Sequence, residues 1–146
     1  MAFISITRLR VRSWRFLPAF VWYALRSVRQ AQSASGYLGG NTYGDARLTF
    51  WTASAWQDEP AMKAFRTAEP HMTAMRKLAH WCDEASVAHW SSGAATLPSL
   101  EEVYQLMRAH GRPSRVNHPS PQQRAMDIAP PVSRGERYWP PYQSRV

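Results

Sequence analysis

The sequence is poor in cysteine and contains no long hydrophobic run. Cys82 is the only cysteine, so the chain can form no internal disulfide and has no Cys-x-x-Cys zinc or redox motif. The longest apolar run, residues 16–25, has about half of the ~20 residues that a membrane-spanning helix needs. From these absences we expect a cytoplasmic protein with no metal site.

Acidic residues are missing from the first 44 residues, which hold six arginines. Residues 45–93 carry five bases against six acids, and residues 94–146 carry seven against four. This distribution disfavours nucleic acid as a partner, because a nucleic-acid binder needs a basic stripe across its folded face. The basic N-terminal region is expected to be a solvated surface, with peripheral contact to anionic lipid as the alternative. The side chains concerned are Arg8, Arg10, Arg12, Arg15, Arg26 and Arg29, beside Trp14, Phe16 and Trp22.

The remaining composition predicts one folded domain followed by a different kind of segment. The chain has 146 residues, of which 45% are hydrophobic and 12% aromatic, which is enough for a core. Seven of the eleven prolines lie in residues 112–146, which we expect to be extended or disordered. The aromatic residues at 138–142 are expected to form an adhesive segment within this tail. The predicted divisions are a folded domain over 1–93, a linker and helix over 94–111, and the tail over 112–146.

The pattern of apolar residues predicts the order strand, helix, strand, strand, helix, strand. The strands are expected over 3–12, 37–43, 48–56 and 85–90, and the helical segments over 18–32, 58–66 and 70–81, with a further helix ending near Gly111. Gly39 and Gly40 inside the second strand indicate a bulge or a close approach. The order is that of the split βαβ, ferredoxin-like α+β fold, which places helices on one face of an antiparallel sheet. The other face then needs cover, and a homodimer would supply it.

One stretch also resembles a known family. The pairs that carry the likeness are Phe50-Trp51, Ala55-Trp56, Asp58-Glu59, Ala61-Met62 and Ala64-Phe65, followed by His71 and Ala74-Met75. With these residues the segment from 2 to 92 resembles the antibiotic-biosynthesis-monooxygenase-like superfamily, and within it the spheroidene-monooxygenase-like proteins. The resemblance implies a dimeric α+β barrel. It implies no single activity, because fold does not fix function.

The resemblance leaves the cofactor open. Members include cofactor-free oxygenases of aromatic polyketides, haem-degrading oxygenases, carotenoid oxygenases and proteins without a known reaction. In the haem-degrading members the iron ligand lies ten residues after a helical tryptophan. Phe65 stands at that tryptophan position here, and ten residues on is Met75 rather than histidine. Haem degradation is therefore disfavoured, while haem binding through another histidine and cofactor-free chemistry remain equally open.

His71 is the candidate catalytic residue. Near a helix N-terminus a neutral imidazole is favoured, so His71 could act as an acid, a base or an axial ligand. The alternative is a structural histidine that packs on Met75. His89 is expected to be a half-buried strand histidine, and a metal site at His80 and Cys82 is disfavoured because the two point to different sides of a helix.

The aromatic content suggests a large apolar pocket between sheet and helices. The candidate substrate-binding residues are Trp22, Tyr23, Trp51, Trp56, Phe65 and Met75. We therefore expect a monooxygenase-like protein for a large hydrophobic polyene or aromatic substrate. The alternative is a non-catalytic dimeric barrel that binds a hydrophobic ligand or a partner protein, with much of the aromatic set serving as core and interface.

Overall fold

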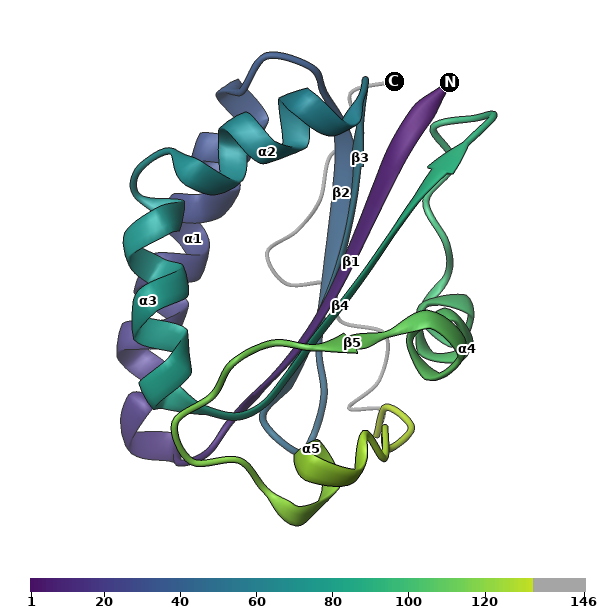
Figure 1. The fold of residues 1–146 in the computed structure, drawn as a ribbon. Coiled ribbons are helices and arrows are strands. Elements are labelled where there is room, and N and C mark those ends of the chain that lie inside the picture. Colours follow the sequence, from purple (N-terminus) through teal and green to yellow (C-terminus); the bar gives the residue numbers. More distant parts are fainter. Residues whose placement is uncertain (133–146) are drawn as a thin grey trace.

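The computed structural model describes residues 1–132, so the expected adhesive segment at 138–142 lies outside the described residues. A five-stranded antiparallel sheet lies between a layer of three long helices and a thinner C-terminal layer (Figure 1). The elements are β1 (Ala2–Val11), η1 (Trp14–Phe16), α1 (Leu17–Ser33), β2 (Tyr37–Gly44), β3 (Thr49–Trp56), α2 (Glu59–Thr67), α3 (His71–Trp81), β4 (Cys82–Ser92), α4 (Leu100–His110), β5 (Arg112–Pro113) and α5 (Pro121–Ala125).

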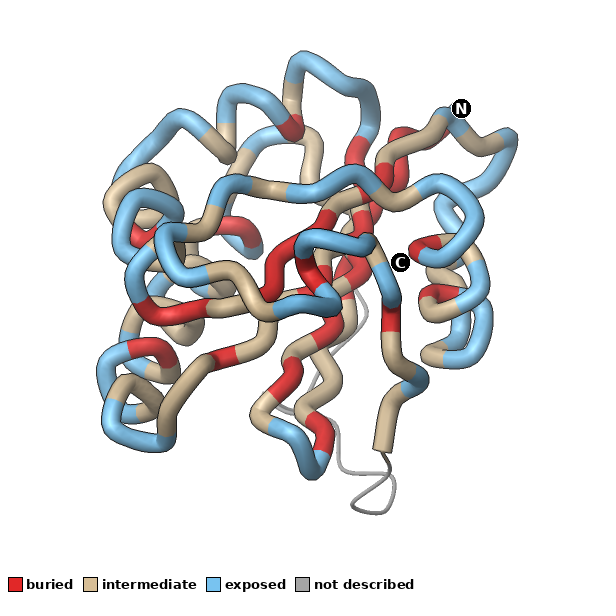
Figure 2. Tube along the Cα trace, turned by 60° about the horizontal axis from the view of Figure 1, so that its bottom comes forward, coloured by how far each residue is buried: buried red, intermediate tan, exposed pale blue. Residues whose placement is uncertain are grey.

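The strand order is β2-β3-β1-β4-β5, and every pairing is antiparallel. β1 lies in the middle, with Ile6 opposite Ala53 of β3 and Ala88 of β4. All three side chains are buried on the face away from α1–α3. Because side chains alternate along a strand, the neighbours of Ile6 and Ala53 face the helix layer. The buried residues follow the strands through the middle of the molecule (Figure 2).

Local signals in the sequence explain the helix layer. Asp58 caps α2, with its Oδ1 accepting a hydrogen bond from the Ala61 amide at 2.9 Å, and Pro60 occupies the first turn, where no amide hydrogen is needed. The N-cap of α3 is Pro70 itself. The predicted order of elements is confirmed, and the chain has a ferredoxin-like α+β fold.

A bulge interrupts β2 where the sequence predicts one. The register against β3 shifts between Tyr37 and Gly39. At Gly40 a Cβ atom would lie 2.7 Å from the Tyr37 hydroxyl and 3.1 Å from the Ala53 carbonyl oxygen. A side chain at position 40 would displace the Tyr37 hydroxyl and crowd the Ala53 carbonyl, which favours glycine there.

The chain itself covers the second face of the sheet. The Ser99 hydroxyl and the Glu102 carboxylate form a capping box at the start of α4, and Val103 and Met107 are fully buried against β1 and β3. Ile128 joins the same core. From the sequence we expected a second subunit to cover this face of the sheet. In the structure α4 and the segment that follows α4 cover this face.

The beginning of the expected tail is part of the fold. Residues 112–113 form a short edge strand with β4, and the Gln123 side chain donates to and accepts from the Ala85 backbone at 2.9 and 3.0 Å. Gln123 also donates to the Ser114 carbonyl oxygen. Residues 112–132 are therefore packed on the sheet rather than disordered, held by these polar contacts and by the buried side chain of Ile128.

β4 is longer than the expected strand 85–90 because it begins directly after α3. Glu84 and Arg8 face each other across the β1–β4 pair, 2.7 Å apart, with side chains 3% and 4% exposed. Arg10 reaches the same carboxylate at 3.2 Å. Arg8 therefore does not lie on a solvated basic surface. In the part of the chain that the structure describes, no helix has the length and apolar character to cross a membrane.

Candidate functional site

His71 is fixed at the junction between α2 and α3. The side chain of Gln30 on α1 accepts a hydrogen bond from the His71 backbone amide at 2.8 Å and donates one to the Phe65 carbonyl oxygen at 3.2 Å. Gln30 therefore ties α1 to both sides of the break between α2 and α3. The position of the His71 ring is determined by three helices at once.

The hydrogen bond of the His71 ring defines its protonation pattern. Nδ1 lies 3.2 Å from the Arg66 carbonyl oxygen, and a carbonyl oxygen can only accept. Nδ1 must therefore carry the hydrogen in this contact. In the neutral ring, Nε2 then holds a lone pair, which can accept a proton or ligate a metal.

A stack of aromatic rings begins at this histidine. The Phe65 ring lies 4.5 Å from the His71 ring, and the Trp56 ring stacks on Phe65 at 5.0 Å. The indole Nε1 of Trp56 donates to the Ser54 hydroxyl at 2.9 Å, which fixes the orientation of the indole ring. The sequence-based alternative placed Met75 against His71, but the ring contact that the structure shows is with Phe65.

A second histidine belongs to the same region. His89 on β4 faces the helix layer, opposite Ser5 of β1, and its ring lies 5.7 Å from Phe3. Phe3 and Trp56 share one core cluster, with Phe65 packed against it. We call these five residues the histidine–aromatic cluster: Phe3, Trp56, Phe65, His71 and His89.

The surroundings favour the neutral form of both histidines. Burial lowers the pKa of His71, and the Arg66 charge acts in the same direction against the opposing hydrogen bond to the Arg66 carbonyl. The pKa of His89 is lowered by burial and then by the charges of Arg112 and Arg66. At neutral pH the site therefore offers two uncharged imidazoles, either of which can accept a proton.

Small hydroxyl side chains line the sheet beside the cluster. Ser5 and Thr7 on β1 face the helix layer, and they pair with Ser54 and Thr52 on β3. All four are only half-buried, although they lie on interior strands beneath a layer of helices. The helices therefore do not seal the sheet at this place. A bound molecule here would meet hydroxyl groups on the sheet side and aromatic rings at one end.

No family model and no curated protein matches the sequence. Solved structures do match its fold. A protein of Nitrosomonas europaea, provisionally assigned as an antibiotic biosynthesis monooxygenase, is similar with a TM-score of 0.58 and 15% identity over 65% of this chain and 93% of the other. A variant of SnoaB, a cofactor-independent oxygenase of Streptomyces nogalater, gives 0.54 and 12% over 67% and 98%. Rv0793 of Mycobacterium tuberculosis gives 0.56 and 11% over 64% and 97%.

The chain has the fold of these proteins. At this level of identity the likeness shows the fold alone, so the superfamily resemblance and the spheroidene-monooxygenase-like branch within it stay predictions. The matched structures are covered almost completely, while about a third of this chain is not. β1 to β4 occupy residues 2–92, so the part beyond them is about the size of the unmatched third.

The structure brings together only part of the predicted site. Of the candidate residues, Trp56, Phe65 and His71 lie in one cluster. Tyr23 lies in a separate core cluster and packs on Trp81, with ring centroids 5.5 Å apart.

The other three candidates do not face this site. Trp51 is fully buried on the opposite face of the sheet, where it meets Tyr104 of α4. Trp22 is 60% and Met75 42% exposed on the outside of the helix layer. A pocket between sheet and helices therefore cannot be lined by Trp51, Trp22 or Met75.

From the sequence we expected His89 to be only a half-buried strand histidine, and we assigned no role to the serine and threonine hydroxyls of the strands. The alternation of Ser5 and Thr7 with apolar neighbours, repeated by Thr52 and Ser54, was the available signal. Two strands with small hydroxyls at every second position predict a polar strip where the strands pair. Only the pairing register shows that His89 lies opposite Ser5 on this strip.

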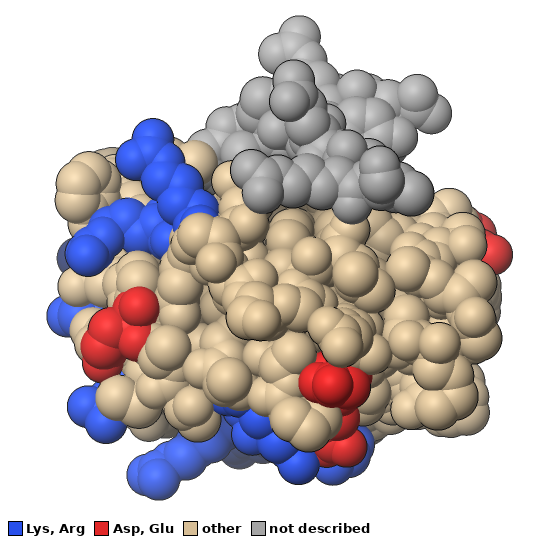
Figure 3. Space-filling view, turned by 90° about the horizontal axis from the view of Figure 1, so that it is seen from above, with Lys and Arg blue, Asp and Glu red and all other residues tan. Residues whose placement is uncertain are grey.

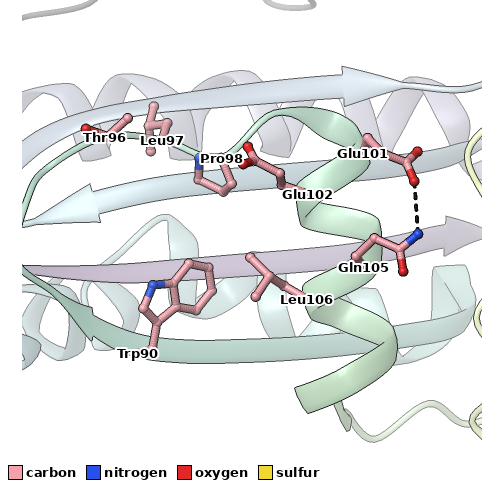
Figure 4. Close-up of a pocket in the computed structure, with 8 residues that line it drawn as sticks. All are labelled: Trp90, Thr96, Leu97, Pro98, Glu101, Glu102, Gln105 and Leu106. Carbon is pink, nitrogen blue, oxygen red and sulfur yellow. Dashed lines mark hydrogen bonds between the residues drawn. The ribbon is translucent and has the colours of Figure 1, made fainter.

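A hollow of about 370 Å³ lies beside α4, on the other side of the sheet (Figure 4). Its lining residues are Trp90, Thr96, Leu97, Pro98, Glu101, Glu102, Gln105 and Leu106. Both carboxylates already have partners, Glu101 with the Gln105 amide and Glu102 with the Ser99 backbone. The hollow contains no histidine, and its two carboxylates lie at exposed positions, so we place the candidate site at the histidine–aromatic cluster.

Proposed function

We propose that this protein is a monooxygenase-like enzyme that acts, without a cofactor, on a large hydrophobic aromatic or polyene substrate between the sheet and the helix layer. One observation carries the proposal: the Arg66 carbonyl holds the Nδ1–H of His71, which leaves Nε2 of the neutral ring as a proton acceptor. Burial lowers the pKa of His71, which favours that neutral ring. The fold it shares with SnoaB, a cofactor-independent oxygenase, supports the same reading. The rings of Trp56 and Phe65 supply an apolar wall for the substrate.

The chemistry follows from what a neutral imidazole can do. His71 Nε2 removes a proton from an activated carbon of the substrate, and His89 or a hydroxyl of the strip stabilises the resulting anion. The electron-rich anion reduces dioxygen, and one oxygen atom becomes bonded to the same carbon. Loss of water from the hydroperoxide leaves a carbonyl group. One atom of dioxygen thus ends in the product and the other in water.

Haem is the second candidate, and the donor chemistry of His71 fits it. A ring whose Nδ1–H is bound to a backbone carbonyl, with Nε2 free to ligate, is typical of metal-bound histidines. A haem bound there would supply oxygen activation. The third candidate is non-catalytic binding of a hydrophobic ligand, which the same aromatic wall would allow.

Dioxygen uptake with anthrone, a flat apolar probe with an activated CH₂ group, tests the proposal. The sharpest variant is His71→Asn, because the Asn amide can still donate to the Arg66 carbonyl but provides no base at the place of Nε2. We expect uptake by the wild type and a loss of about 10²-fold or more in the variant. His80→Asn is the matched control, since His80 lies exposed on the same helix, and it should retain full activity.

Three outcomes separate the candidates. Tryptophan fluorescence quenching by anthrone without dioxygen uptake in the wild type would support non-catalytic binding. A Soret band that forms on adding haem and disappears in His71→Asn would support the haem candidate. Equal uptake by the wild type and His71→Asn would overturn the role of His71.

A further inference from the structure

The outer side of the helix layer carries large hydrophobic side chains in an unusual position. Apart from the first residue, the exposed large hydrophobics within residues 1–132 are Trp14 at 74%, Trp22 at 60% and Met75 at 42%. They come from η1, α1 and α3, and α1 and α3 belong to the helix layer on one face of the sheet (Figure 1). Indole rings are stable where one side is apolar and the other wet, as at a membrane surface.

The same side carries unpaired positive charge. Arg15, Arg26 and Arg29 are exposed on η1 and α1, and Arg76 and Lys77 are exposed on α3. Within the described part of the chain none of the five forms a salt bridge. In Figure 3, many of the Lys and Arg side chains lie along the side that carries the helix layer in Figure 1.

Basic groups of this layer lie beside aromatic rings at two places. The Arg26 guanidinium lies 5.9 Å from the Trp22 ring, one helical turn away on α1. The Lys77 ammonium of α3 lies 5.7 Å from the ring of Tyr23 on α1, so the two helices meet at this point. We call this surface the tryptophan–arginine face: Trp14, Arg15, Trp22, Arg26, Arg29, Met75, Arg76 and Lys77.

The acids of the helix layer neutralise only a small part of this face. Glu59 is paired with Lys63 at 2.7 Å on α2. Glu69 is bound to the hydroxyl and backbone amide of Thr73 on α3, and its charge also acts on Arg76 and Arg26, so one acid stands against five bases. An excess of positive charge is therefore left around the exposed indoles.

We propose that the tryptophan–arginine face docks on the surface of an anionic lipid bilayer, with Trp14 and Trp22 at the level of the headgroups. Phosphate and carboxylate headgroups match the arginines, and the interfacial zone accepts the indoles. Nucleic acid fits less well, because its binding does not account for an exposed methionine and two indoles on a layer of packed helices. The proposal does not rest on the proposed function, since it uses none of the residues of the histidine–aromatic cluster.

Co-sedimentation of the full chain with lipid vesicles tests this proposal. Vesicles of phosphatidylcholine alone are compared with vesicles that also contain phosphatidylserine, at low and at physiological ionic strength. We expect binding only to the anionic vesicles, weakened by salt. On binding, the tryptophan emission should shift to shorter wavelength and Trp22→Ser should reduce that shift.

A pair of charge-matched double variants decides whether this face is responsible. Arg26→Gln with Arg29→Gln should weaken binding by about 30-fold, since each basic residue near the membrane contributes about 1 kcal/mol. Arg108→Gln with Arg124→Gln removes the same charge from exposed positions on α4 and α5, and should leave binding unchanged. All four positions are exposed, and circular dichroism confirms that each variant is folded.

Four results would overturn the proposal. They are the absence of binding to anionic vesicles, equal binding to neutral ones, an equal loss in both double variants, and tighter binding to a DNA or RNA duplex than to the vesicles. An equal loss would show that net charge alone attracts the protein to lipid.

Discussion

At the scale of single residues, the lone cysteine is expected to be inert in the folded protein. Cys82 is fully buried where α3 passes into β4, and burial, reinforced by the charge of Asp83, raises the pKa of its thiol to about 12. The thiolate is the reactive form, so almost none is present at about pH 8. We expect no reaction with a thiol reagent such as DTNB in the native protein and one thiol per chain after unfolding in guanidinium. Rapid labelling of the native protein would contradict the burial of Cys82.

His71 should make the stability of the protein depend on pH. Its pKa is lowered in the folded state, so the unfolded chain takes up a proton first as the pH falls through the ordinary histidine value of about 6.5. The free energy of unfolding contributed by His71 is therefore fully present above that pH and is lost below it, by at most ~1.4 kcal/mol per pH unit.

Denaturant unfolding of the wild type and His71→Asn between about pH 5 and about pH 8 measures this contribution. We expect the difference in unfolding free energy between the two proteins to shrink or reverse toward the acid end. Parallel curves over the whole range would show that His71 has the same proton affinity in both states. This measurement needs no substrate, so it tests the surroundings of His71 independently of any reaction.

At the scale of elements, the ion pair between β1 and β4 should be essential to the sheet. Burial by itself would raise the pKa of Glu84, but hydrogen bonds from Ser120 and Arg8 and the charges of Arg8 and Arg10 outweigh it and lower that pKa. Glu84→Gln leaves Arg8 buried without its counter-charge, which we expect to cost about 3–5 kcal/mol of unfolding free energy.

The control for this variant is Glu59→Gln. Glu59 is also 2.7 Å from its cation, Lys63, but both side chains are at least half exposed. Solvent screens such a pair, so we expect little change in the denaturation midpoint. If the two substitutions had equal effects, burial could not be the source of the stability of the Arg8–Glu84 pair.

The sequence predicted the elements well because their ends carry local signals. Asp58 and Ser99 cap helices where the pattern places them, and Gly39–Gly40 marks the bulge. The prediction that the aromatic side chains line one pocket was less accurate than the prediction of the elements. Trp51 and Trp56 lie five residues apart on one strand, and an odd spacing puts them on opposite faces. That part of the site could have been predicted from the alternation alone.

At the scale of the whole molecule, the feature that the sequence did not predict is the C-terminal segment that covers one face of the sheet. A segment rich in proline and arginine is expected not to fold, because such a segment has little apolar surface to bury. Here its contacts are long-range and of both kinds: Ile128 packs in the core beside Met107, Gln123 bonds to Ala85, and Ser120 bonds to Glu84 at 2.8 Å. Such pairings depend on where the chain returns in space, which no local pattern specifies.

This cover changes what we expect of the oligomeric state. A homodimer was expected because one face of the sheet lacked a partner, but Val103, Met107 and Ile128 now bury that face within the chain. We therefore predict a monomer of 16.7 kDa in size-exclusion chromatography with light scattering. Met107→Asp puts a charge beneath α4 and should release the face, so self-association should rise, whereas Arg108→Asp on the exposed side of the same helix should leave the protein monomeric. A wild-type mass of twice the chain at low concentration would show instead that another surface pairs two copies, because α4 and the segment that follows it already occupy this one.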